Sequence, residues 1–159
     1  MNPEDYVSYP IALALKKHGF DEPCHYGYSV KMRLEPELSF GEPKMVHSKV
    51  PKNYNDNRKG IAKGLEFCSA VPLWQAQKWL REEWGVHVDV CIYSDYSTDA
   101  DGKVCDRWDF WGFNLYAVAG GDMMEEGDGE YSSYESALSA GIAAALELIE
   151  KKVTMFASD

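Results

Sequence analysis

The sequence has no long run of apolar residues. A membrane-spanning helix needs roughly 20 consecutive, predominantly apolar residues, and charged residues or glycine interrupt the longest apolar stretches of this 159-residue chain. Met1 is also not followed by the apolar region of a signal peptide. We therefore expect a protein that is not integral to a membrane.

Cysteine is scarce, and its spacing carries no motif. The four cysteines, Cys24, Cys68, Cys91 and Cys105, include no Cys-x-x-Cys pair, so the spacing indicates neither a disulfide framework nor a common zinc or redox motif. Widely spaced thiols without such motifs are typical of a reducing compartment. The sequence predicts a cytoplasmic protein with reduced cysteines and no cofactor.

Positively charged residues are in deficit. The chain has 16 Lys and Arg against 26 Asp and Glu, which gives a formal net charge of −10. Such a surface repels the phosphates of nucleic acids and anionic membranes, so we expect neither as a direct partner. The same charge leaves one alternative open: an acidic surface can imitate DNA and inhibit a basic nucleic-acid-binding protein.

Familiar catalytic signatures are absent as well. The sequence contains no Gly-x-Ser-x-Gly, no His-Glu-x-x-His and no Gly-x-x-x-x-Gly-Lys motif, which are the usual marks of hydrolases, zinc proteases and phosphate-binding loops. The sequence therefore favours a non-enzymatic protein. A small hydrolase stays open as an alternative, because catalytic residues need only converge in space.

Large apolar side chains, in contrast, are plentiful. Apolar residues make up 45% of the chain and aromatic residues 13%, including 5 Trp and 10 Tyr. A chain of this length and composition can bury a core without the support of disulfides or metals. We predict a single α+β domain that covers residues 1–159.

The clearest local signal is a change of hydrophobic period at Gly85. Apolar residues recur three or four positions apart from Pro72 to Trp84 and then alternate from Val86 to Ile92, which predicts a helix followed by a half-buried strand. Pro72 suits a first helical turn, and Gly85 suits the left-handed residue that ends a helix.

Hydrophobic period, turn residues and caps predict the remaining elements. Ser8 is expected to cap a short first helix that ends at Gly19, and Ser132 and Glu135 have the spacing of a capping box before a long last helix. Proline, glycine and polar residues dominate a long irregular insertion around 35–67. The other predicted elements are a strand at 26–34, short strands near 44–49 and 65–68, a hairpin that joins 86–92 to an aromatic strand at 108–118, and an acidic loop at 120–129. This order favours a mostly antiparallel sheet of three or four strands with three helices packed on one face.

The face of the sheet opposite the helices is the candidate binding surface. Strand alternation would place aromatic, ionisable and hydrogen-bonding side chains on it together, and such a mixture suits a partner protein because aromatic groups supply area while polar neighbours fix register. A solvated face, or one that the long loop covers, is the alternative. The candidate binding residues are His25, His87, Asp89, Tyr93, Asn114 and Tyr116, with Lys31 and Cys91 on the same face. A homo-oligomer is left open.

Two metal sites are considered and disfavoured. Ser97-x-Asp99-x-Asp101-Gly102 has the spaced oxygens of a calcium loop, but Trp108 stands where a bidentate Glu is needed, so an Asx-rich hairpin turn is predicted instead. Zinc-type ligands also occur, but without the closely spaced pairs of common zinc sites. These residues are His25, His87, Asp89 and Cys91. We predict no metal site.

Three segments together resemble a family of small uncharacterised proteins common in Bacteroidetes and their prophages. The segments are ALALKKHGFDEPC, CSAVPLWQAQKWLREEWGVHVDV and SYESALSAGIAAALELIEK, and they span most of the chain. The resemblance implies a phage or mobile-element accessory protein. From the residues themselves we expect it to bind another macromolecule, through the aromatic sheet face or the acidic loop. The resemblance implies no activity, cofactor or catalytic residue.

Overall fold

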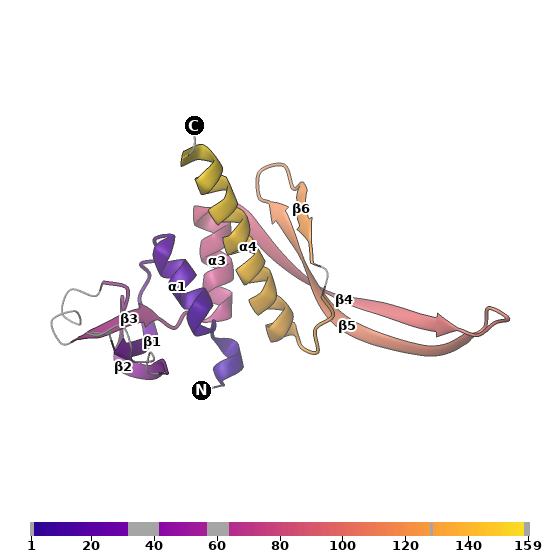
Figure 1. The fold of residues 1–159 in the computed structure, drawn as a ribbon, viewed down its shortest axis with the longest axis horizontal. Helices are drawn as coiled ribbons and strands as arrows, with labels where there is room; N and C mark the ends of the chain where they lie inside the picture. The colour runs from indigo at the N-terminus through magenta and orange to yellow at the C-terminus, as the bar shows by residue number, and fades with distance from the viewer. Residues whose placement is uncertain (1, 32–41, 57–63, 128, 158–159) are drawn as a thin grey trace, which may run out of the picture. The chain divides into compact units, whose positions relative to one another are not determined.

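The computed structural model describes residues 2–31, 42–56, 64–127 and 129–157 (Figure 1). In these ranges the helices are η1 (Pro3–Asp5), α1 (Tyr9–Lys17), α3 (Leu73–Glu83) and α4 (Tyr134–Ala157). The strands are β1 (Cys24–Lys31), β2 (Lys44–Lys52), β3 (Leu65–Ser69), β4 (Val86–Thr98), β5 (Val104–Ala117) and β6 (Met123–Glu126). All pairings between these strands are antiparallel, and the predicted α+β class is confirmed.

The chain divides into two compact units, which we call the first unit (1–76) and the second unit (77–159). Each unit contains one three-stranded sheet, with strand order β2-β1-β3 in the first and β4-β5-β6 in the second. That the whole chain folds as a single domain stays a prediction.

The strands therefore form two sheets where the sequence predicted one sheet of three or four strands. β1 is the central strand of the first sheet, between β2 and β3, and β5 is the central strand of the second, between β4 and β6; no pairing among the described strands joins the two sets. The helices do not share one sheet face either, because α1 contacts β3 whereas α4 contacts β4 and β5.

The long insertion contains regular structure where short strands were predicted. Strand β2 covers the segment expected near 44–49, and β3 covers 65–68, so both predictions are confirmed. The end of the predicted strand at 26–34, with Met32 and Leu34, lies outside the described residues. β1 ends at Lys31 within them.

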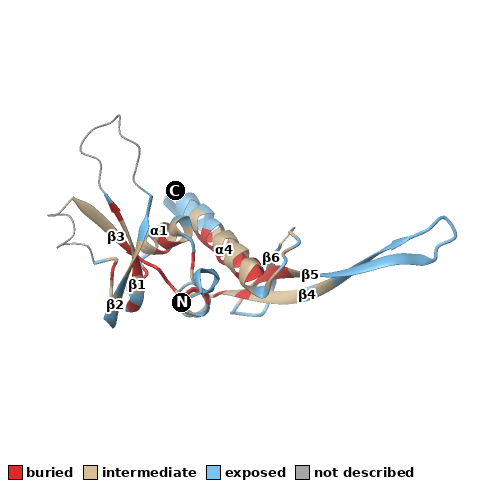
Figure 2. Ribbon diagram, turned by 90° about the horizontal axis from the view of Figure 1, so that it is seen from below, coloured by how far each residue is buried: buried red, intermediate tan, exposed pale blue. Residues whose placement is uncertain are grey.

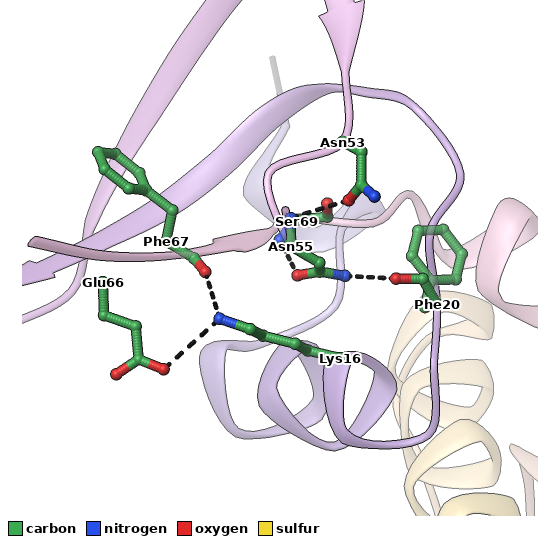
Figure 3. Close-up of polar contacts among 7 residues, drawn as sticks. All are labelled: Lys16, Phe20, Asn53, Asn55, Glu66, Phe67 and Ser69. Carbon is green, nitrogen blue, oxygen red and sulfur yellow. Dashed lines mark hydrogen bonds and ion pairs between the residues drawn. The ribbon is translucent and has the colours of Figure 1, made fainter. Parts of the chain in front are cut away.

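Side chains from α1 and from the segment after β2 hold the first unit together (Figure 3). Asn55 donates from Nδ2 to the carbonyl of Phe20 at 2.7 Å, and its Oδ1 accepts the backbone N–H of Ser69 at 2.9 Å. The Lys16 ammonium donates to the carbonyl of Phe67 at 2.9 Å and lies 3.6 Å from the Glu66 carboxylate. These bonds satisfy backbone groups that the sheet ladders leave unpaired.

The helix-to-strand change at Gly85 is confirmed. Helix α3 ends at Glu83, Gly85 has φ +64°, and β4 begins at Val86. Gly19, with φ +90°, likewise follows α1. Ser8, however, makes no side-chain cap, and only its carbonyl accepts the first helical bond, from Ala12 N–H at 2.9 Å.

Helix α4 begins one residue later than its predicted capping box. Ser133 Oγ accepts the backbone N–H of Ser136 at 3.1 Å, and Ser136 Oγ accepts the backbone N–H of Ser133 at 3.2 Å, so two serines make the reciprocal bonds expected of Ser132 and Glu135. Gly141 lets the helix approach the sheet closely, because a Cβ there would lie 2.4 Å from Val88 Cγ1 and 3.1 Å from the Phe113 ring.

Candidate binding surface

Four of the six candidate residues form opposed pairs on β4 and β5. His87 lies opposite Tyr116, and Asp89 lies opposite Asn114. Tyr93 has the same parity on β4, so it lies on the same face. Helix α4 packs against the opposite face, the one that carries Val88 and Phe113.

His25 is not part of this surface. It belongs to β1 in the first unit, where its ring stacks on His47 with centroids 6.4 Å apart and its Nδ1 lies 3.1 Å from the carbonyl of Ser48. The sequence grouped it with the others because strand parity alone cannot tell which sheet a strand joins. A binding role for the other five residues stays a prediction.

Polar side chains on this face form a connected chain of contacts. Asn114, which is 6% exposed, donates from Nδ2 to Tyr93 Oη at 2.9 Å and contacts Cys91 Sγ at 3.6 Å. Cys91 Sγ in turn lies 3.4 Å from Asp89 Oδ2. Two buried acceptor atoms of the face, Asn114 Oδ1 and His87 Nδ1, have no partner among the described residues.

These contacts raise the pKa values of the Cys91 thiol and of the Tyr93 phenol. Burial raises the pKa of the Cys91 thiol, and the Asp89 carboxylate raises it further. The hydrogen bond to Cys91 raises the pKa of Tyr93, and the negative charge of Glu126 acts in the same direction. Nucleophilic cysteines are typically activated by a lowered pKa, and the shift at Cys91 has the opposite direction.

The ring of Tyr93 is held in one orientation. It stacks on Phe110, with centroids 5.6 Å apart and planes at 20°. It also lies directly over Gly112, because a Cβ at that glycine would be 2.7 Å from the ring. The hydrogen bond from Asn114 fixes its hydroxyl end.

A pocket of about 190 Å³ adjoins this ring. Its lining residues come from three parts of the second unit and are Tyr93, Phe110, Glu126, Gly127, Gly129 and Glu130. Sequence reasoning placed Tyr93 on the candidate face and Glu126, Gly127 and Gly129 in the acidic loop, but it did not identify Phe110 or Glu130. Glu126 was assigned to the acidic loop, but β6 pairs it with Asn114, and no β-branched residue in Met123–Glu126 signals a strand there.

Beyond this pocket, β4 and β5 continue as a two-stranded hairpin, which we call the distal ribbon (94–109). Figure 1 shows it running past α4, and Figure 2 shows its residues exposed. Its exposed apolar side chains include Tyr96 at 61%, Val104 at 54% and Trp108 at 40%. Register places Tyr96 opposite Arg107 and Trp108 opposite Asp95, so Tyr96 and Trp108 lie on opposite faces.

The turn of the distal ribbon is the predicted Asx turn. Asp99 Oδ1 accepts the backbone N–H groups of Asp101 at 3.0 Å and Lys103 at 2.9 Å, and Gly102 has φ +79°. The Asp99 carboxylate thus stabilises the turn by accepting hydrogen bonds from its backbone. In the part of the chain that the structure describes, no group of three or more His, Cys, Asp or Glu could hold a metal.

Comparison with family models, with curated proteins and with solved structures finds no match for the chain. The resemblance to the Bacteroidetes and prophage family therefore stays a prediction. None of the described helices has the length and apolar character needed to cross a membrane.

Proposed function

We propose that the protein is a non-enzymatic binding protein that docks on another protein through its distal ribbon. The observation that carries this proposal is that every residue from Ser94 to Asp109 is exposed, including Tyr96 and Trp108. A two-stranded hairpin gains little stability on its own in water. Exposed aromatic side chains on such an element are typical of interaction sites, where they supply most of the binding energy.

The charge of the ribbon favours a partner with a basic surface. Residues 94–109 contain five aspartates against Lys103 and Arg107. Complementary charge steers association and discriminates between partners. The partner is therefore a protein whose docking site combines basic side chains with apolar area.

A nucleic-acid-binding protein is the second candidate partner. Its basic surface would meet the acidic second unit in place of a phosphate backbone. The proposal includes a cytoplasmic location, which the four free thiols support because reducing compartments maintain them. It also includes the accessory role that the family resemblance implies.

The test uses the full chain, immobilised, with an extract of its own host. The variant Tyr96→Ser/Trp108→Ser removes the exposed rings, and Val50→Ser is a matched control because Val50 is 73% exposed on β2. We expect the wild type and the control to retain a basic protein that the double variant loses. Retention should also fall at about 1 M salt, where the screening length is roughly 3 Å.

Competition and self-association then separate the alternatives. If duplex DNA displaces the chain from its partner, the partner is a nucleic-acid-binding protein. If the double variant retains the same proteins as the wild type, the proposal is wrong. It is also wrong if sedimentation shows that the ribbon binds only a second copy of this chain.

A further inference from the structure

The pocket beside Tyr93 combines an aromatic wall with two carboxylates. Its aromatic wall consists of Tyr93 and Phe110, and Glu126 and Glu130 supply negative charge. Its volume of about 190 Å³ is several times the roughly 30 Å³ share of one water molecule in the liquid. The pocket can therefore hold a group of several non-hydrogen atoms.

The aromatic wall is built before any ligand arrives. The Tyr93 ring stacks on Phe110 at 5.6 Å, lies over Gly112 and accepts a hydrogen bond from Asn114 at 2.9 Å. Ring faces that are already fixed attract a cation without the entropy cost of ordering them.

Nothing basic lines this pocket among the described residues. The nearest cation of the ribbon in sequence is Arg107, and its register opposite Tyr96 places it on the other face of the strand pair. The negative charge of Glu126 acts on Tyr93 directly, since it contributes to the raised pKa of the phenol. The described lining thus carries two carboxylates and no basic side chain.

A buried acceptor lies on the same face. Asn114 is 6% exposed, pairs with Glu126 across β5 and β6, and has no partner for its Oδ1 among the described residues. A buried acceptor without a partner is costly. Asn114 does not line the pocket itself, but its Nδ2 donates to the hydroxyl of Tyr93, which does.

We propose that the pocket binds the guanidinium group of an arginine side chain of the partner protein. A guanidinium is planar, so it stacks on an aromatic face, and its N–H donors form paired hydrogen bonds with carboxylates. An ammonium is a point charge without that planar geometry. This inference rests on the proposed function, because it assigns one contact of the same docking event.

The test is an NMR titration of the full chain with N-acetyl-arginine methylamide. We expect saturable shifts of the Gly127 and Gly129 amide signals. The citrulline analogue, which has nearly the same shape but no charge, should cause none. Glu126→Gln should weaken arginine binding about tenfold, because a charge-assisted bond becomes a neutral one. Glu125→Gln is the matched control: Glu125 is exposed, as Glu126 is, but it lies opposite Leu115 and does not line the pocket.

Three outcomes would overturn the inference: equal shifts with arginine and citrulline, equal binding of N-acetyl-lysine methylamide, or equal weakening by Glu125→Gln and Glu126→Gln. The proposed function has a separate readout. If Tyr96→Ser/Trp108→Ser still abolishes partner binding while the arginine titration fails, the ribbon docks on a partner and only the pocket assignment is wrong.

Discussion

The two units of the chain differ sharply in charge. Residues 1–76 contain nine acidic and ten basic side chains, whereas residues 77–159 contain 17 acidic and six basic ones. The first unit therefore has a net charge of +1 and the second unit a net charge of −11. Net charge acts on partners and association rates rather than on the fold, so this difference supports a recognition role for the second unit.

Two asparagines show a second difference between the units. In the first unit, Asn55 uses both ends of its amide, bonding to Phe20 and Ser69. In the second, Asn114 donates to Tyr93 but its Oδ1 has no described partner. The first unit uses its polar side chains to hold its own backbone, and the second unit leaves a buried acceptor on the face that we propose binds a partner.

Truncation of one core leucine in each unit tests whether the units unfold together. Leu15 and Leu115 are both fully buried, so Leu15→Ala and Leu115→Ala should each cost about 3 kcal/mol of unfolding free energy. If residues 1–159 form one domain, calorimetry should show a single transition that both changes shift. Two transitions, each sensitive to only one of the changes, would contradict the single-domain prediction.

Replacement of each asparagine by alanine should show how much its side chain contributes to the free energy of unfolding. Asn55→Ala removes the side chain that bonds to the Phe20 carbonyl and to the Ser69 N–H. It should cost about 2–3 kcal/mol of unfolding free energy. Asn114→Ala removes one donor and an already unpartnered acceptor, so it should cost about 1 kcal/mol. Urea unfolding of both variants measures the difference. Equal costs would show that Asn114 is as structural as Asn55.

Local elements could be predicted from the sequence because each has a local cause. The left-handed Gly85, the strands near 44–49 and 65–68, and the Asx turn at Asp99 depend on residues close to them in the chain. The shared face of His87, Asp89, Tyr93, Asn114 and Tyr116 follows from strand period and antiparallel pairing.

Features that depend on pairing between distant segments could not be predicted in the same way. The division into two sheets depends on which edges of β1 and β5 are occupied. The same strand pairing places His25 in a different sheet from the other candidate residues and sets Glu126 opposite Asn114. Phe110 and Glu130 meet in the pocket through that pairing, so these two lining residues had no signal in sequence spacing.

A matched pair of strand glycines offers a finer comparison. Each lies under a tyrosine ring: a Cβ at Gly27 would be 2.5 Å from Tyr54, and one at Gly112 would be 2.7 Å from Tyr93. Tyr54 is 4% exposed and cannot move freely, so Gly27→Ala should destabilise the protein by about 2 kcal/mol. Tyr93 is only half-buried, so an added methyl group meets less tightly packed surroundings and Gly112→Ala should cost less than about 1 kcal/mol.

The two glycine variants should rank in the opposite order when arginine binding is measured instead of stability. Gly112→Ala displaces the ring that lines the pocket and should weaken N-acetyl-arginine methylamide in the NMR titration, whereas Gly27→Ala should leave it unchanged. Loss of arginine binding in both variants would mean that general destabilisation, rather than the position of the Tyr93 ring, controls the pocket.

The smallest expected effect concerns the thiols of the two units. Cys24 and Cys68 are buried in the first unit, and burial raises the pKa of each from 9.0 to about 11. Cys105 is exposed in the second unit. A thiol reagent at neutral pH should therefore modify Cys105 first, and the two buried thiols should react only as the protein unfolds.

The raised thiol pKa values also predict a loss of stability at alkaline pH. Between pH 9 and about 11 these thiols lose their protons in the unfolded chain but keep them in the folded one. Their contribution is therefore complete below pH 9 and falls as the pH rises through this window. Cys24→Ala/Cys68→Ala should flatten the dependence of the unfolding free energy on pH, and Cys105→Ala should not. An unchanged slope in the double variant would assign the alkaline loss to tyrosines of the first unit whose pKa values desolvation also raises, among them Tyr28 and Tyr54.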